Sequence, residues 1–182
     1  MSDALSTVRA EVSAVLDKVD ADAPARLAER LLGAPRVFVG GEGRSGFIAK
    51  SFAMRLMHLG LSVYAVGETI TPGFADGDLL VGVSGSGTTA GTVRAAEQVR
   101  AKGGLVVAVT TDPDSPLGGL AEACLVVPAA TKWRRPGESA TEQPLGSLFD
   151  QCTHLVLDAV CLQISRRREV SLAEARAQHA SE

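Results

Sequence analysis

The chain has 182 residues, enough for one domain with a sizeable core and too few for two domains of typical size. Its 18 Lys and Arg against 21 Asp and Glu give a net charge of -3, and its basic clusters are short, so nucleic acid is not an expected partner. No apolar run approaches the roughly 18 residues of a membrane span, and the charged N-terminal stretch is not a secretory signal, so we expect a cytoplasmic protein without a membrane partner.

The elements begin with two amphipathic helices, predicted within residues 3–33 from apolar positions at helical spacing, the second starting near Pro24. A buried strand over 36–39 then leads into a glycine-rich turn and a further helix. Four more strands are expected, over residues 62–66, 78–83, 105–109 and 124–127. Turn signals and helical stretches separate them, which favours βαβ units.

Such units are right-handed and give a parallel sheet covered on both faces. We therefore expect an α/β fold of three layers (αβα), a doubly wound sheet of five parallel strands in the order 2-1-3-4-5. In that order the first and third strands are neighbours, and their carboxyl ends flank the point where ligands bind.

The C-terminal part starts with residues 129–142, where all periodicity is lost and an exposed, mobile loop is expected. C-terminal helices are predicted over 144–180: a long helix whose polar stripe carries Asp150 and His154, then a short one. A capping box of Ser171 and Glu174 opens the short helix. Cys124, Cys152 and Cys161 have no metal or redox spacing and are expected to be reduced, structural residues.

Residues 84–89, Ser-Gly-Ser-Gly-Thr-Thr, are the most informative segment because they join a buried strand to a helix. The glycines let the backbone approach a ligand, and the unpaired amides and dipole of the helix N-terminus favour an anion. Hydroxyls of Ser84, Ser86 and Thr89 add neutral donors, so a phosphate can bind without Lys or Arg. The alternative is a tight turn with an ordinary Ser/Thr helix cap.

The turn after the first strand, Gly43-Arg44-Ser45-Gly46, is expected to face the same crevice. Residues 41–46 also read as Gly-x-Gly-x-x-Gly, the pattern of a dinucleotide site. That alternative is weaker, because Glu68 comes two residues beyond the apparent end of the second strand and a second phosphate loop would be unexplained.

Several stretches together resemble one family: 43–47, 53–60, 66–69, 71–72, 84–87, 113–117, 143–149 and His179. They resemble the SIS (sugar isomerase) fold, which is flavodoxin-like, and more closely the 6-phospho-3-hexuloisomerases, along nearly the whole chain. The resemblance implies a single SIS domain over 1–182, with the terminal helices packing on it or between subunits. It implies interconversion of arabino-3-hexulose 6-phosphate and fructose 6-phosphate, in the ribulose monophosphate route of formaldehyde fixation, by a homotetramer that uses no metal or organic cofactor.

Carried over by position, the resemblance assigns phosphate binding to Ser45, Ser84, Ser86 and Thr89. The other residues of the two turns, Gly43, Arg44, Gly85, Gly87 and Thr88, complete the predicted substrate-binding set. Asp150 stands where the family usually has the Glu proposed as base, one methylene shorter, and Thr88 stands where Glu is usual. Glu142 and Glu68 are the other carboxylates able to act as base, and His179 is a candidate for ring opening or proton transfer, from a neighbouring subunit. The alternative for Asp150 is a solvated helix residue paired with His154.

Moving a carbonyl between C3 and C2 through an enediol requires a base and donors for the developing oxyanion. Two alternatives remain open: a non-catalytic SIS module that senses a sugar phosphate, and an isomerase for arabinose 5-phosphate or sedoheptulose 7-phosphate. The apolar terminal helices exceed what a five-stranded sheet can cover, so we expect a homo-oligomer.

Overall fold

A computed structural model of the chain describes residues 3–135, 138–169 and 172–177. The strands are β1 Val37–Gly41, β2 Val63–Ala65, β3 Leu79–Val83, β4 Leu105–Thr110 and β5 Ala123–Val126. The helices are α1 Ala4–Leu16, α2 Ala23–Gly33, α3 Gly43–His58, α4 Ala90–Ala101, α5 Pro116–Leu120, α6 Ser147–Arg168 and α7 Leu172–Ala177.

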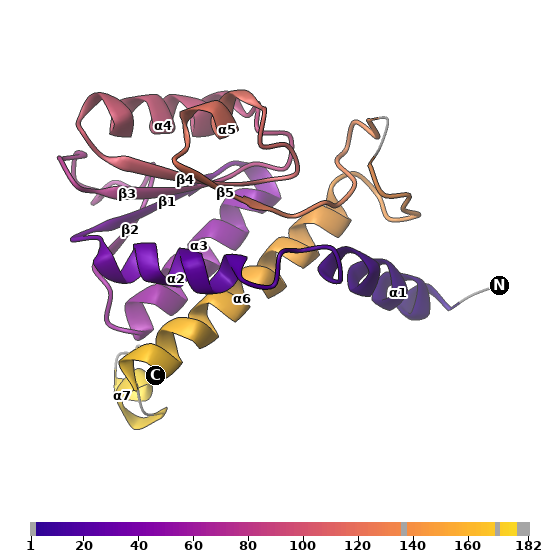
Figure 1. The fold of residues 1–182 in the computed structure, drawn as a ribbon, viewed down its shortest axis with the longest axis horizontal. Coiled ribbons are helices and arrows are strands. Elements are labelled where there is room, and N and C mark those ends of the chain that lie inside the picture. The colour runs from indigo at the N-terminus through magenta and orange to yellow at the C-terminus, as the bar shows by residue number, and fades with distance from the viewer. Residues whose placement is uncertain (1–2, 136–137, 170–171, 178–182) are drawn as a thin grey trace.

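The five strands form one parallel sheet in the order β2-β1-β3-β4-β5, which confirms the predicted fold (Figure 1). β1 and β3 pair along their whole length, from Val37 opposite Leu79 to Gly41 opposite Val83. Both strands therefore end at the same level, and the turns that follow them start side by side. This register is what positions the candidate site.

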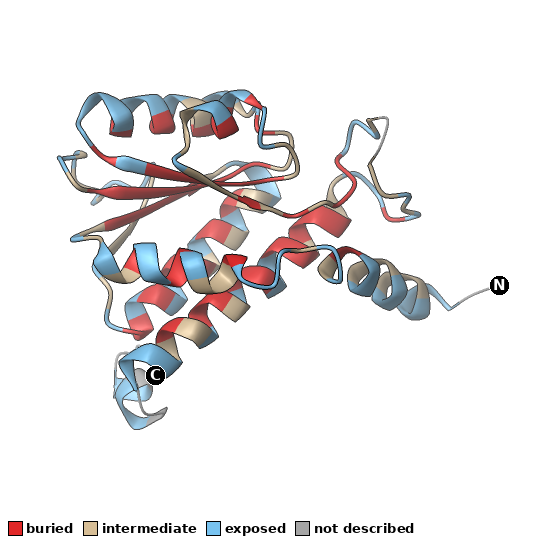
Figure 2. Ribbon diagram, viewed as in Figure 1, coloured by how far each residue is buried: buried red, intermediate tan, exposed pale blue. Residues whose placement is uncertain are grey.

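The sheet is covered on both faces. α4 and α5 pack on one face, where Phe38, Leu80 and Leu117 belong to one apolar cluster. α2 and α3 pack on the other, with α6 beyond them in contact with α1, α2 and α3. Figure 2 shows the strands buried between these layers and α4 buried only on the side that faces the sheet. The near-continuous apolar sequence of β3, buried at every position, is what such a central strand requires.

One predicted connection is wrong. The segment between β2 and β3 contains turns and no helix, although helical stretches were expected between all the later strands. Residues 67–77 hold three glycines and one proline, which disfavour a helix and suit a tight return of the chain to the sheet.

The segment of residues 129–142 also differs in part from the prediction of an exposed loop. It has neither helix nor strand among its described residues, as expected, but Ala129, Ala130 and Thr131 are buried. Ser171 of the predicted capping box lies outside the described residues, as does the end of the predicted range 144–180; α7 begins at Leu172.

A partly buried ion pair between Arg36 and Asp78 fixes the start of β3. Asp78, 1% exposed, accepts hydrogen bonds from the Arg36 Nε (2.8 Å) and Nη2 (2.6 Å) and from the amide of Ala75 (2.6 Å). Burial on its own would raise the pKa of this carboxyl, but these donors outweigh it and hold the pKa below its ordinary value.

The three cysteines are free thiols, with Cys152 and Cys161 buried, in agreement with a structural role. Burial raises the pKa of Cys152 to about 11 and that of Cys161 to about 12, so both stay protonated near neutral pH. In the part of the chain that the structure describes, no helix combines the length and apolar character needed to cross a membrane.

Candidate functional site

A cavity of about 250 Å³ lies at the carboxyl ends of β1 and β3, where the sequence predicts that the two turns meet. Both turns line it, together with the end of α6 and part of the segment between β5 and α6. The lining residues are Glu42, Gly43, Arg44, Ser45, Gly85, Ser86, Thr89, Thr131, Lys132, Trp133, Gly146, Phe149 and Asp150. The expected meeting of the turns is therefore observed.

Residues 43–46 form the first turn of α3, and only Glu42 separates this helix from β1. Gly46 permits this, because a Cβ there would lie 2.8 Å from the carbonyl oxygen of Gly41. The N-cap position of α3 is Glu42, whose side chain makes no capping hydrogen bond, and no other described side chain caps this helix. The first-turn amides of α3 are thus left toward the cavity, an arrangement that favours an anion.

The serine loop, residues 84–89, is a tight turn closed by the amide of Gly87 on the carbonyl of Ser84 (3.0 Å). Thr89 occupies the N-cap position of α4, but its hydroxyl contacts the Ser84 hydroxyl (2.8 Å) and makes no capping bond to the helix. Ser86 and Thr88 hydroxyls likewise contact each other at 2.8 Å. The alternative of an ordinary Ser/Thr cap is therefore not what the described structure shows.

The serine loop packs against the segment around Ser115. Gly87 has φ 64°, and a Cβ on it would lie 1.9 Å from the Ser115 Oγ. That hydroxyl donates to the Asp112 carbonyl (2.6 Å) and accepts from the Gly118 amide as the N-cap of α5. The Leu117 amide in turn donates to the Gly87 carbonyl at 3.0 Å. Residues 113–117 thus matter because they hold the serine loop in place.

Asp150 is buried, with 6% exposure, at the cavity end of α6. Its Oδ2 accepts from the Arg44 Nε at 2.9 Å and its Oδ1 from the Ser45 hydroxyl at 3.1 Å. The neighbouring Phe149 packs its ring against Gly85, where a Cβ would lie 3.1 Å from the ring. One turn of α6 therefore places a carboxylate beside the first turn and an aromatic ring on the serine loop.

The alternative that Asp150 is a solvated residue paired with His154 is wrong. His154 lies 3.6 Å from Asp158, one turn further along α6, and both side chains are largely exposed. Helical spacing allows either pairing, and the packing of α6 against α3 decides between them by turning Asp150 inward.

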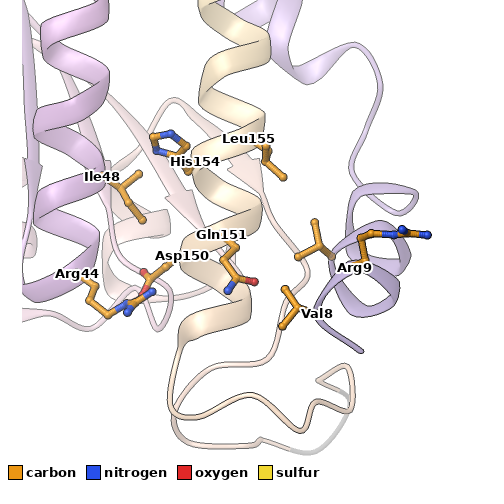
Figure 3. Close-up of a pocket in the computed structure, with 9 residues that line it drawn as sticks. Val8, Arg9, Arg44, Ile48, Asp150, Gln151, His154 and Leu155 are labelled. Atoms are coloured by element: carbon orange, nitrogen blue, oxygen red, sulfur yellow. The ribbon is translucent and has the colours of Figure 1, made fainter. Parts of the chain in front are cut away.

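Arg44 and Asp150 also line a second hollow, a groove of about 480 Å³ between α1, α3 and α6. Its other lining residues are Val8, Arg9, Val12, Ile48, Gln151, His154 and Leu155. Figure 3 shows the Arg44 side chain directed at Asp150, while the Arg9 guanidinium points away from α6. The groove and the cavity thus adjoin the same ion pair.

The remaining predicted site residues lie apart from the cavity lining. Ser84 is buried behind Thr89, Gly87 is buried on Ser115, and Thr88 is exposed. Glu142 is exposed, and its amide donates to Glu11 of α1 (2.8 Å). Glu68 pairs with Lys50 at 2.5 Å, with both side chains about half exposed. His179 lies outside the described residues.

Several lining residues were not among the predicted ones. Thr131, Lys132 and Trp133 come from an aperiodic segment. Glu42, Gly146 and Phe149 lie within the stretches 41–46 and 143–149 that the sequence singled out, but no role in the site was assigned to them. A Lys next to the chain's single Trp was the one available signal. Among the described residues, no group of three or more His, Cys, Asp or Glu is placed to hold a metal ion.

Comparisons with known proteins agree with this architecture. Residues 30–140 match the SIS domain family. The chain is 45% identical over 177 residues to the 3-hexulose-6-phosphate isomerase of Mycobacterium gastri, covering 97% of this chain and 88% of that protein. It is 41% identical over 143 residues to the protein of the same name from Bacillus subtilis, covering 79% and 77%.

Among solved structures, a Methanococcus jannaschii protein superimposes with a TM-score of 0.82 at 27% identity, covering 97% of each chain. Its structure was taken to imply a molecular function of 3-hexulose-6-phosphate isomerase. With its parallel sheet in the order 2-1-3-4-5 and its near full-length match to these relatives, the chain belongs to the SIS domain family, among the 3-hexulose-6-phosphate isomerases.

Proposed function

We propose that this protein is a sugar-phosphate isomerase that interconverts arabino-3-hexulose 6-phosphate and fructose 6-phosphate, as part of the ribulose monophosphate pathway. The observation that carries the proposal is that the buried Asp150 carboxylate and the serine loop line the same cavity. A phosphate held at the loop leaves the sugar carbons to extend toward Asp150. The relatives named for this reaction support the choice of substrate.

The phosphate is assigned to the hydroxyls and amides at the start of α4. Ser86 and Thr89 line the cavity, and Ser84 fixes the orientation of Thr89 through their 2.8 Å contact. The described side chains leave the N-terminus of α4 uncapped, so its amides and dipole favour the dianion. Binding the non-reacting end of the substrate in this way positions the reacting end.

Asp150 is assigned the role of base. In the direction of fructose 6-phosphate it removes the proton from C2, the electron pair forms the C2–C3 double bond, and the C3 carbonyl oxygen becomes an enediolate oxygen. The proton returns to C3, and the proton of the C2 hydroxyl passes to O3, directly or through solvent, which leaves a carbonyl at C2 and a hydroxyl at C3.

Ser45 and Arg44 orient the Asp150 carboxylate, and the exposed remainder of the Arg44 guanidinium lies where it can stabilise the developing negative charge. Because the reaction only relocates protons and one electron pair within the sugar, these side chains supply the chemistry that it requires.

A homotetramer in the cytoplasm, built from one SIS domain per chain, completes the proposal. The groove between α1 and α6 supports association, because it is lined by apolar residues of three helices and adjoins the Arg44–Asp150 pair. Exposed apolar side chains on the same helices also support association: Leu5 is 69% exposed and Leu155 is 45% exposed. A second copy seated there would shield the site from water, and His179 of a neighbouring subunit is the proposed assistant in proton transfer.

The test is a coupled assay that detects fructose 6-phosphate formed from arabino-3-hexulose 6-phosphate, with arabinose 5-phosphate and sedoheptulose 7-phosphate run in parallel. The proposal expects turnover of the hexulose phosphate well above that of the other two. If no fructose 6-phosphate forms but the same sugar phosphate raises the melting temperature of the protein, the protein is a sensor instead. Turnover of only one of the other sugars would reassign the substrate.

A further inference from the structure

Lys132 lies in the segment between β5 and α6. Its neighbours Ala129, Ala130 and Thr131 are buried, whereas Lys132 and Trp133 are exposed and line the cavity together with Ser86 and Thr89. The chain is thus anchored up to Thr131 and then presents two side chains to the serine loop.

Hydrogen bonds hold this segment in place without regular secondary structure. Glu138 accepts from both the amide (2.8 Å) and the hydroxyl (2.6 Å) of Thr131. The Arg134 guanidinium donates to the carbonyls of Thr131 (2.5 Å), Gln143 (2.6 Å) and Leu145 (2.7 Å), which ties the two ends of the segment together. The segment is therefore a defined wall of the cavity.

The outer side of the same wall is tied to α1. The Glu11 carboxylate accepts from the Thr141 hydroxyl (2.6 Å), the Glu142 amide (2.8 Å) and the Gln143 Nε2 (2.9 Å). Partial burial opposes ionisation of Glu11, but these donors outweigh it and lower its pKa, so the tie is strongest when Glu11 is charged.

The charges of the cavity give Lys132 a specific role. Two carboxylates line it, Glu42 and Asp150, and Arg44 is already paired with Asp150 at 2.9 Å. Within the described residues, the Lys132 ammonium has no carboxylate within ion-pair distance and lies 4.8 Å from the centre of the Trp133 ring. Without Lys132 the lining would be net negative and would repel a phosphate dianion.

We propose that Lys132 binds the phosphate of the substrate, opposite the hydroxyls of Ser86 and Thr89, and leaves the face of Trp133 when it does so. The inference rests on the proposed function, and it adds a cation to a site otherwise built from hydroxyls and amides. A lysine suits this task because its ammonium is a compact charge on a flexible stem that can move from the ring to the ligand.

The experiment compares Lys132→Met, Lys132→Arg and, as a matched control, Lys102→Met at the exposed end of α4. Because Trp133 is the single tryptophan, its fluorescence reports binding of fructose 6-phosphate and of inorganic phosphate directly. Lys132→Met should weaken both ligands by about 10- to 100-fold, as expected for loss of a charged hydrogen bond. Lys132→Arg should recover most of the affinity, and Lys102→Met should behave as wild type.

Kinetics of the same variants separate the possible outcomes. The inference expects Lys132→Met to raise KM with kcat nearly unchanged, and to weaken the dependence of KM on salt. A lower kcat at constant KM would place Lys132 at the reacting carbons and overturn the assignment. Unchanged affinity for both ligands would also overturn it while leaving the isomerase intact. Failure of the wild-type protein to bind either ligand would count against the proposed function itself.

Discussion

Arg44 at the start of α3 and Asp150 at the start of α6 are 106 residues apart in the chain and form an ion pair of 2.9 Å. The carboxylate is buried, whereas the Arg44 side chain remains 65% exposed. The pair joins the two halves of the site, because Arg44 belongs to the turn after β1 and Asp150 to the helix that packs Phe149 on the serine loop. It places a fixed carboxylate where a base is required.

Replacement of this carboxylate tests its role. Asp150→Asn should lower kcat by about 10²- to 10⁴-fold, the usual contribution of a general base, while fructose 6-phosphate still binds. Asp150→Glu keeps the carboxylate and should lose far less. The control is Asp158→Asn on the exposed side of α6, which should leave the steady-state kinetics unchanged. Equal losses in Asp150→Asn and Asp158→Asn would show a structural effect of α6 instead.

The hydroxyls of Ser86 and Thr88 contact each other, but we expect their removal to change KM by different amounts. Ser86 lines the cavity and Thr88 is exposed outside the lining. Ser86→Ala should raise KM about tenfold, since it removes a hydrogen bond to a charged group, and Thr88→Ala should change KM by less than about twofold. Steady-state kinetics on the purified variants measure both. A larger effect of Thr88→Ala would mean that the phosphate lies on the outer side of the loop.

Gly87→Ala should disturb the serine loop. The residue has φ 64°, and its added methyl would overlap the buried Ser115 side chain. Backbone strain alone should cost about 1–3 kcal/mol in the free energy of unfolding, and phosphate affinity should fall because the loop must move. Urea unfolding and a phosphate titration are the measurements. Gly33→Ala, at the end of α2, where nothing lies within 4 Å of the added methyl, serves as the control and should lower neither the free energy of unfolding nor the phosphate affinity.

The Arg36–Asp78 pair predicts a pH dependence of stability. The pKa of Asp78 is lower in the folded than in the unfolded protein, so the unfolded chain binds more protons in acid. The stabilisation is therefore complete above the unfolded value of about 3.9 and is lost as the pH falls further. Asp78→Asn should lose about 3 kcal/mol at pH 7 and less at pH 3, below the unfolded pKa, measured by urea unfolding. An equal loss at both values would contradict the assignment.

The sheet could be predicted from the sequence because its strands are apolar along most of their length. Segments such as Leu79 to Val83 have no other stable place than the middle of a covered parallel sheet, and the order of elements restricts the topology. The serine loop was also readable, since its residue types directly follow β3. The β2–β3 connection was not, because apparent helical signals there were overridden by Gly and Pro.

The sequence predicted the two turns of the site, but it could not predict the partner of Asp150 or the position of Lys132, because both depend on tertiary packing. The partner of Asp150 follows from the rotation of α6 about its axis, which is set by contacts with α1, α2 and α3 and is ambiguous in a helix with polar residues at several positions. Lys132 belongs to a segment without periodicity, and its place is set by hydrogen bonds of the preceding residue, Thr131, with Arg134 and Glu138 that no local pattern encodes.

The matched ends of β1 and β3 restrict how this scaffold can change its ligand. The two turns are fixed to a continuous ladder of hydrogen bonds, so neither can shift to admit a longer or shorter sugar without breaking it. The described residues of the wall between β5 and α6 form no such ladder, and those beyond the buried Ala129, Ala130 and Thr131 are mostly exposed and can accept exchanges at little cost to the core. Redesign toward a different chain length should therefore begin with exchanges among residues 132–135 and 138–142 and leave both turns untouched.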